Sequence, residues 1–241
     1  MIAVGGDGTA NLLASNLRNT QMMLGIIPAG SANGMARELG ITEDPTASLR
    51  IIEEGIYKKI SLIEINNRIS LHLSDIGLNA KMLREFQSKG TRGLLGYLLA
   101  TVKVLWRRSA IKVELHYKDQ IRKVRADLIL IANATMYGTG VLVNPVGKLD
   151  DDVFEVIVIK DLTIKDLLNT SLHTFRLDER KAEIIQVNEV ELVCKRLTDF
   201  QVDGEYLGKV KAIKAKLLPD SLNVLVPPPS PKATVDETTR S

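Results

Sequence analysis

The sequence has very few of the residues that build disulfides and histidine-rich metal sites. Cys194 is the single cysteine, and the three histidines, His72, His116 and His173, lie far apart in the chain. An intrachain disulfide is therefore excluded, which fits a reducing compartment, and no histidine pair has metal-ligand spacing. Because Cys194 lies within an apolar run, we expect it to be a buried strand residue.

Long hydrophobic runs are also lacking. The longest, Leu94–Trp106, contains Lys103, and at about 13 residues it is too short to cross a bilayer. The first residues include Asp7 and lack the basic segment of a secretory signal. These absences predict a cytoplasmic protein without a membrane-spanning helix.

Neither sign of charge is in strong excess. Lysine and arginine number 32 against 29 acidic residues, which gives a net charge of +3. With 25% charged residues the chain is an ordinary globular protein, and without an RNA- or DNA-binding motif we expect no nucleic-acid partner. A weakly basic protein is compatible with nucleotide phosphates or with an anionic membrane surface.

What the sequence does contain is a glycine-rich turn at its start. Ile2–Val4 is typical of a buried strand, Gly5–Asn11 (G-G-D-G-T-A-N) of a tight turn, and residues 11–19 of a short helix. Free N–H groups at such a turn can bind phosphate, although the spacing fits neither the Walker loop nor G-x-G-x-x-G. From the residues alone, a glycine turn stabilised by Asp7 is an equally good interpretation.

A second segment, Ile26–Ile41, repeats this order of apolar strand, small-residue turn and helix. The turns G-G-D-G-T-A-N and P-A-G-S-A-N resemble the signatures of soluble lipid kinases with a diacylglycerol kinase catalytic domain. That family includes bacterial diacylglycerol kinases and sphingosine and ceramide kinases, and the resemblance covers about residues 1–226. It implies ATP as co-substrate, with phosphates held at Gly5, Gly6, Asp7, Gly8, Thr9, Asn11, Gly30, Ser31 and Asn33.

Two departures from the family pattern concern the N-terminal part. Gly34 stands where many bacterial diacylglycerol kinases have aspartate. Members also usually have a strand–helix–strand stretch before the glycine turn, whereas this chain starts at the strand that enters it. We therefore expect an open sheet edge with exposed apolar residues, and a shortened N-terminus.

The pattern of elements predicts an α/β + β fold. Residues 1–56 alternate strands and helices and would form part of an α/β nucleotide-binding domain, like that of NAD kinases and diacylglycerol kinases. Residues 57–226 contain many short alternating strands separated by turns, which predicts an antiparallel β-sandwich. After a hairpin over residues 58–74, strands are expected at 111–117, 124–132, 154–159, 182–187, 190–195, 200–202, 210–217 and 223–226. Helices are expected at residues 79–89, 94–108 and 163–175, and residues 227–241 read as a disordered tail.

An acidic segment, Asn144–Val156, resembles the family pattern N-P-x-A-x-x-D-D-G-x-[FL]-[ED]-V. The resemblance implies a structural Mg²⁺ held by the carboxylate of Asp151 and the backbone carbonyls of Lys148 and Val153, oxygen ligands of the kind that hard cations prefer. Asp152 replaces the family glycine. The alternative is an acidic surface turn that leads into a strand.

Phe200–Glu205 matches the family D-G-E motif. The resemblance implies a general base that accepts the proton of the lipid hydroxyl, with Glu205 as first choice and Asp203 as second, and with Asp7 acting at the phosphate or metal. Without the resemblance, D-G-E is an ordinary hairpin turn. Ser74–Ala80 resembles a further family segment, and it is either a strand-to-helix corner or part of the lipid cleft.

These features predict an ATP-dependent lipid kinase that transfers the γ-phosphoryl group to diacylglycerol or a similar lipid, peripherally at a membrane surface. Leu94–Arg108 is either a core helix or a wall of the acyl-chain cleft. Two alternatives stay open: a shortened, inactive relative that binds nucleotide or lipid, and an NAD kinase, since NAD kinases share the G-G-D-G-T turn. An exposed sheet edge also makes a homodimer plausible.

Overall fold

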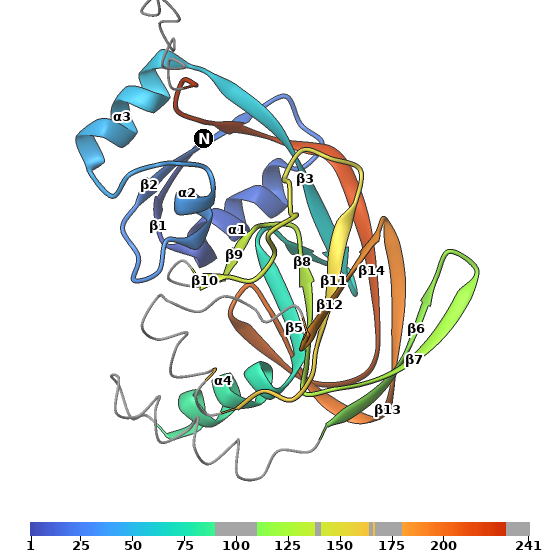
Figure 1. The fold of residues 1–241 in the computed structure, drawn as a ribbon. Helices are drawn as coiled ribbons and strands as arrows, with labels where there is room; N and C mark the ends of the chain where they lie inside the picture. Colours follow the sequence, from blue (N-terminus) through green and yellow to red (C-terminus); the bar gives the residue numbers. More distant parts are fainter. Residues whose placement is uncertain (90–109, 138–140, 164–165, 167–179, 230–241) are drawn as a thin grey trace, which may run out of the picture.

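A computed structural model gives the fold and describes residues 1–89, 110–137, 141–163, 166 and 180–229. Figure 1 shows two blue parallel strands with three helices at one end of the molecule, and a β-rich part coloured from cyan to red at the other. The α/β + β fold class predicted from the sequence is confirmed.

The N-terminal part is a small α/β unit. Strands β1 (Ile2–Gly5) and β2 (Met23–Pro28) pair in parallel, and they are connected by helix α1 (Asp7–Leu17). Helices α2 (Gly34–Glu38) and α3 (Pro45–Glu54) follow. Helix α1 begins within the glycine turn rather than at residue 11, because the carbonyl of its N-cap residue Gly6 already accepts hydrogen bonds from Thr9 and Ala10.

Strand β1 is the first strand in the sheet order, so one of its edges has no partner strand within the described part of the chain. Its residues alternate: Ala3 is buried, whereas Ile2 and Val4 are 46% and 62% exposed. The expected open edge with exposed apolar side chains is therefore present. Such an edge is where another strand could add.

The β-rich part begins with β3 (Tyr57–Ile65), β4 (Arg68–Ser70), β5 (Leu73–Gly77) and helix α4 (Leu78–Lys89). It continues with β6 (Ile111–Tyr117), β7 (Gln120–Ala126), β8 (Leu128–Ala132), β9 (Met136–Tyr137) and β10 (Val141–Leu142). The last strands are β11 (Phe154–Ile159), β12 (Ala182–Val187), β13 (Glu189–Val202) and β14 (Glu205–Leu225).

Among these strands, two long ones replace pairs of predicted short ones. Residues 190–195 and 200–202 belong to the single strand β13, and residues 210–217 and 223–226 fall on or next to β14. The predicted break in β13 lies at a register shift between Val193 and Thr198. Conversely, the predicted strand 124–132 is divided between β7 and β8, because the chain turns at Asp127.

The end of β14 connects the two parts of the molecule. Most of β14 pairs antiparallel with β13 and β3, but Asn223 and Val224 also pair in parallel with β2. Val224 is fully buried in the same hydrophobic cluster as Leu24 and Ala14 of the α/β unit. The last residues of the β-rich part are therefore built into the N-terminal sheet, and the proposed domain boundary at residue 56 stays a prediction.

Three hydrophobic clusters support this arrangement. One fills the space between the sandwich strands, one lies under α1, α2 and α3, and the third lies between α4 and strands β5, β8 and β11. Cys194 is buried in the first cluster, as expected. The predicted helices at 94–108 and over most of 163–175, and tail residues 230–241, lie outside the described residues. Among the described residues, no helix has both the length and the apolarity needed to cross a membrane.

Candidate active site

The two glycine turns pack directly against each other. A Cβ atom added to Gly6 would lie 3.1 Å from the Cα of Gly30, and one added to Gly30 would collide with the Cα of Gly6. Asn33 fixes the second turn, because its Oδ1 accepts a 2.8 Å bond from the N–H of Gly30 while its Nδ2 donates a 3.0 Å bond to the Gly30 carbonyl. Asn33 is buried and in the left-handed region, at φ +51°, which asparagine tolerates.

Asp7 joins the first turn to helix α2. Its two carboxylate oxygens accept bonds of 3.0 Å and 2.9 Å from the backbone N–H groups of Gly34 and Met35. These N–H groups open a helix, so a carboxylate there compensates both the unsatisfied donors and the helix dipole. The contacts give Asp7 a positioning role between the turns, and its proposed direct role at phosphate or metal stays a prediction.

The outer surface of this double turn is open. Gly8, Thr9, Gly30 and Ser31 are exposed, and Gly5 is half-buried against the side chain of Thr9. Nothing lies within 4 Å of a Cβ atom built on Gly8. Exposed glycine backbone beside a helix N-terminus is the type of surface on which phosphate groups bind.

The D-G-E motif forms the hairpin turn between β13 and β14. Asp203 and Gly204 both have positive φ, +43° and +84°, as a two-residue turn of this kind requires. The carboxylate of Asp203 accepts bonds of 2.7 to 3.1 Å from the backbone N–H groups of residues 71, 72 and 73 and from the hydroxyl of Ser70. Asp203 therefore clamps the segment between β4 and β5, which argues against it as the general base.

Asn11, the last residue of the G-G-D-G-T-A-N segment, connects that segment to Asp203. Its amide nitrogen donates hydrogen bonds to the Asp203 carboxylate and, at 3.1 Å, to the carbonyl of Ile69. A cavity of about 550 Å³ lies where the two parts meet. Its walls come from α1, from the β3–β4 turn and β4, and from the D-G-E hairpin: Gly8, Asn11, Leu12, Ser15, Arg18, Asn67, Arg68, Ile69, Val202, Asp203 and Glu205.

Glu205 lines this cavity with an accessible carboxylate. Its side chain is 72% exposed and lies 3.8 Å from the guanidinium of Arg68, a long ion pair that leaves its oxygens accessible. Asp203 and Glu205 thus differ sharply, because five donors occupy the first carboxylate and solvent surrounds the second. Of the two predicted bases, the geometry favours Glu205.

The site also contains a buried carboxylate, Asp75, that the sequence analysis did not identify as a site residue. It contacts the D-G-E hairpin through Gln201. Asp75 is fully buried and accepts hydrogen bonds from Gln201, Asn79 and the N–H of Ala80. Gln201 in turn accepts a 2.6 Å bond from the N–H of Gly204. Burial raises the pKa of Asp75 to about 6, against the hydrogen bonds that lower it. The signal in the sequence was a charged residue within a short predicted strand.

The predicted metal residues lie elsewhere, in the turn before β11. The Asp151 Oδ1 accepts a long 3.4 Å bond from the N–H of Val153, and its other oxygen has no partner among the described residues. Lys148 is exposed and Val153 half-buried, and neither lines the cavity beside Glu205. A carboxylate and backbone carbonyls are oxygen ligands of the kind that a hard cation such as Mg²⁺ takes. Within the described ranges, no three His, Cys, Asp or Glu residues cluster as a metal site, so carbonyls or water would complete it.

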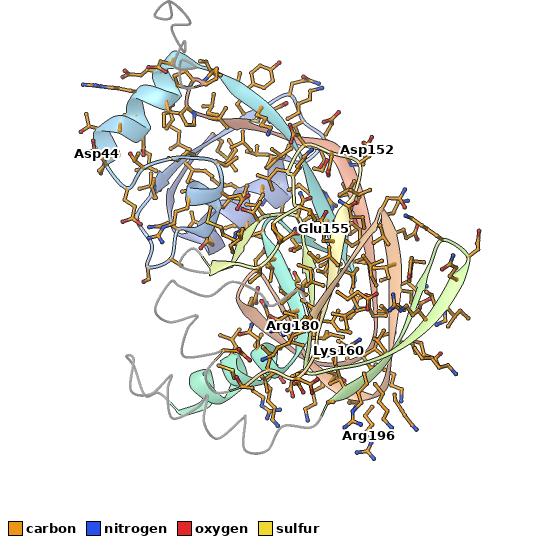
Figure 2. The ribbon with its side chains drawn as sticks, in the orientation of Figure 1. Asp44, Asp152, Glu155, Lys160, Arg180 and Arg196 are labelled. Carbon is orange, nitrogen blue, oxygen red and sulfur yellow. The ribbon has the colours of Figure 1, made fainter. Side chains whose placement is uncertain are left out.

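Two other residues of the Asn144–Val156 motif have a structural role. Asn144 donates a 2.6 Å bond to Glu155, which also accepts a 3.0 Å bond from Gln186 of β12. Glu155 is 1% exposed, and burial raises its pKa. Asp152, by contrast, is exposed on the outside of the turn, as Figure 2 shows, so the residue that replaces the family glycine points away from the core.

Comparison with known proteins identifies the family. Residues 1–65 match the diacylglycerol kinase catalytic domain, and residues 75–226 match the YegS C-terminal NAD kinase beta sandwich-like domain. A diacylglycerol kinase of Staphylococcus epidermidis is 30% identical over 220 residues, covering 88% of this chain and 69% of the relative. The chain belongs to the diacylglycerol kinase family of lipid kinases. This kinase is also 27% identical to a "Probable lipid kinase YegS-like" of Chromohalobacter salexigens, over 94% of this chain and 76% of the relative.

Solved structures share the fold of the kinase. A diacylglycerol kinase from Bacillus anthracis aligns with a TM-score of 0.69 at 18% identity, over 94% of this chain and 76% of that one. An NAD kinase from Archaeoglobus fulgidus in complex with ATP aligns with a TM-score of 0.55 at 14% identity, over 93% and 76%. At these identities the likeness concerns the fold alone, and it accounts for the combination of an α/β unit with a β-sandwich.

Proposed function

We propose that this kinase transfers the γ-phosphoryl group of ATP to a hydroxyl group of diacylglycerol or a similar membrane lipid. One observation carries the proposal: the exposed glycine turn and the accessible carboxylate of Glu205 border the same cavity. Phosphoryl transfer requires a phosphate site and a base in reach of one another. The names of the relatives in Staphylococcus and Chromohalobacter support a lipid as acceptor.

In this proposal the phosphates of ATP bind at the Gly5–Thr9 turn and at the Gly30–Asn33 turn, through backbone N–H groups other than those of Thr9 and Gly30. Those two groups already donate to the Gly6 carbonyl and to Asn33 Oδ1. Asp7 keeps the two turns in register through Gly34 and Met35. When the nucleotide is bound, a Mg²⁺ ion would neutralise part of the charge of its phosphates. The resident Mg²⁺ proposed at Asp151 would instead stabilise the turn before β11, away from the cavity.

Glu205 acts as the general base. The lipid hydroxyl oxygen forms a bond to the γ-phosphorus as the bond from that phosphorus to the ADP oxygen breaks, and the hydroxyl proton passes to the Glu205 carboxylate. The guanidinium of Arg68 lies 3.8 Å from that carboxylate, on the wall of the same cavity. Asp203 is a positioning residue, since its oxygens already accept bonds from the β4–β5 segment.

The acceptor can be identified by transfer of label from [γ-³²P]ATP in mixed micelles. The panel contains diacylglycerol, monoacylglycerol, phosphatidylglycerol, sphingosine, soluble NAD and a control without acceptor. Labelled diacylglycerol or another lipid product supports the proposal. Label in NAD alone would replace it with NAD phosphorylation, and ATP binding without any labelled acceptor would favour a non-catalytic relative.

A further inference from the structure

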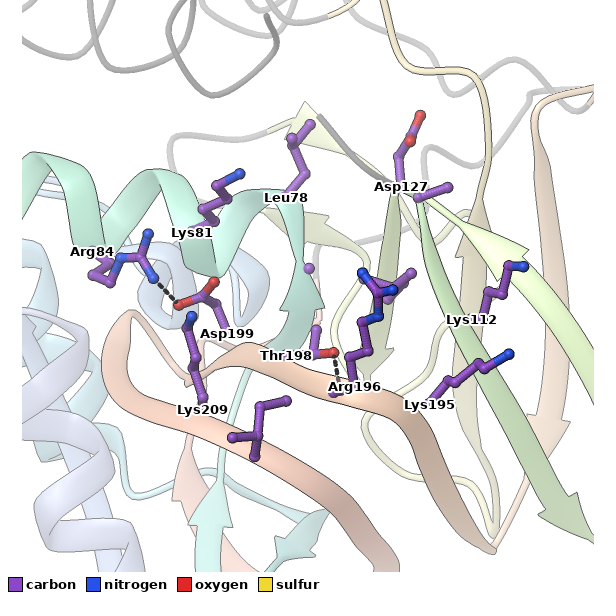
Figure 3. A pocket seen from close by; sticks show the side chains of 14 residues that line it. Leu78, Lys81, Arg84, Lys112, Asp127, Lys195, Arg196, Thr198, Asp199 and Lys209 are labelled. Carbon is purple, nitrogen blue, oxygen red and sulfur yellow. Dashed lines mark hydrogen bonds and ion pairs between the residues drawn. The ribbon is translucent and has the colours of Figure 1, made fainter. Parts of the chain in front are cut away.

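A second concavity, of about 400 Å³, lies in the β-rich part and shares no lining residue with the proposed active site. It is bounded by the start of α4, by β6, and by the middle of β13 with the facing part of β14 (Figure 3). Its lining is unusually basic. Six basic side chains surround it, against two acidic ones (Asp127 and Asp199): Lys81, Arg84, Lys112, Lys195, Arg196 and Lys209.

Both acidic side chains are already engaged. Asp199 accepts a 2.6 Å bond from Arg84 and a 2.8 Å bond from the hydroxyl of Tyr206. Asp127 accepts a 3.0 Å bond from the backbone N–H of Leu162. None of these contacts involves Lys112, Lys195, Arg196 or Lys209.

Four of the basic side chains have no such partner. Among the described residues, Lys112, Lys195, Arg196 and Lys209 make no side-chain hydrogen bond and no ion pair. They come from three different strands, and in Figure 3 Lys209 lies beneath α4, Arg196 lies in the centre of the view, and Lys112 and Lys195 lie on the β6 side. Positive charges brought together in this way repel one another unless an anion lies between them.

The local backbone explains how these side chains come to surround the cavity. The β13–β14 register shifts between Val193 and Thr198, so Lys195, Arg196 and Leu197 leave the regular ladder. The Thr198 hydroxyl donates a 2.9 Å bond to the carbonyl of Arg196, which braces the irregular segment. Bulges of this kind redirect side chains beside functional sites. Leu197, 63% exposed, projects from the same segment.

We propose that this basic pocket binds a phosphate group. A guanidinium and several ammonium groups around one concavity match the charge and the acceptor oxygens of a phosphate, since arginine can bind it bidentately. A cavity of about 400 Å³ has room for the organic part of a phosphate ester. The ester can be a small soluble molecule or the headgroup of a lipid. The site is separate from the transfer reaction, so the pocket can be tested by binding alone.

The test compares the parent protein with Lys195→Gln/Arg196→Gln and with a matched control, Lys59→Gln/Lys216→Gln. The control removes the same charge from exposed strand positions outside the pocket. One arm measures equilibrium dialysis of radiolabelled glycerol 3-phosphate. The other measures co-sedimentation with phosphatidylcholine vesicles, with and without phosphatidylglycerol. A second pocket variant, Lys112→Gln/Lys209→Gln, covers the case in which the first does not fold.

We expect each pocket variant to bind at least about tenfold more weakly than the control in one arm, because charge-assisted contacts are lost. Loss in the dialysis arm identifies a soluble phosphate ester, and loss in the vesicle arm identifies a lipid headgroup. The difference should shrink as salt is added. Equal binding by parent, control and pocket variants in both arms overturns the proposal, and so does an equal loss in pocket and control variants.

Discussion

Replacing Asp203 by asparagine separates the structural from the catalytic interpretation of the D-G-E motif. In the folded protein one carboxylate oxygen accepts bonds from Ser70, His72 and Leu73, and the other from Leu71 and Asn11. An asparagine amide has one oxygen and one NH₂ group. In either orientation of the amide, the NH₂ group therefore faces protein groups that need a hydrogen-bond acceptor. At least two of these partners lose their acceptor.

The expected cost follows from those contacts. A hydrogen bond to a charged group contributes about 1.5–3 kcal/mol, and a donor left unsatisfied costs about 1–3 kcal/mol. Because Asp203 is only half-buried, water relieves part of this cost, and we expect Asp203→Asn to lower the free energy of unfolding by about 2–4 kcal/mol. That is a large fraction of the total stability of a typical domain.

Urea denaturation of parent, Asp203→Asn and Glu205→Gln measures the effect. Glu205 is the matched control, because its exposed side chain makes one long ion pair, and its substitution should change the free energy of unfolding by less than about 0.5 kcal/mol. If Asp203→Asn unfolds at the parent's urea concentration yet loses turnover, the clamp is wrong and Asp203 belongs in the chemistry.

Three further predictions concern other parts of the molecule. Gly30→Ala places a methyl group against the backbone of Gly6, so overpacking should reduce the free energy of unfolding by about 1–3 kcal/mol and lower the Tm. Gly8→Ala, whose methyl group meets open space, should leave the Tm unchanged. Equal melting curves for the two variants would refute the packing of the turns. Burial raises the pKa of Asp75 to about 6, so the folded protein retains a proton that the unfolded chain releases from about pH 4. Stability should therefore fall by about 2–3 kcal/mol as pH rises through that window, and urea midpoints of Asp75→Asn should depend less on pH; parallel profiles would contradict this. Mg²⁺ without nucleotide should raise the Tm of the parent and of Asp150→Asn but not of Asp151→Asn, and an equal rise in all three would remove Asp151 from the metal site.

The sequence was sufficient for local features. Strands β6, β11 and β12 have the predicted bounds, because apolar alternation between turn residues is a local signal. The D-G turn was likewise readable, since positive φ at two successive positions favours these residues. At β13 the sequence predicted a break after Lys195, whereas the strand continues to Val202 with a shifted register.

What could not be predicted are contacts between distant segments. The donors to Asp203 lie some 130 residues earlier in the chain, and nothing near the D-G-E motif specifies them. The parallel pairing of Asn223 with β2 is equally non-local. For Asp7 the motif predicted that the residue matters but not its partners, because Gly34 and Met35 approach only when the two glycine turns pack together.

The most direct test of the whole account is single-turnover transfer from [γ-³²P]ATP to diacylglycerol in mixed micelles, with parent and Glu205→Gln measured side by side. We predict labelled phosphorylated lipid from the parent and a rate at least about a hundredfold lower from Glu205→Gln, with unchanged urea unfolding and ATP binding. Transfer by Glu205→Gln at the parent's rate would contradict the assignment of the base. An absence of labelled lipid from a folded, ATP-binding parent would contradict the assignment of diacylglycerol as acceptor.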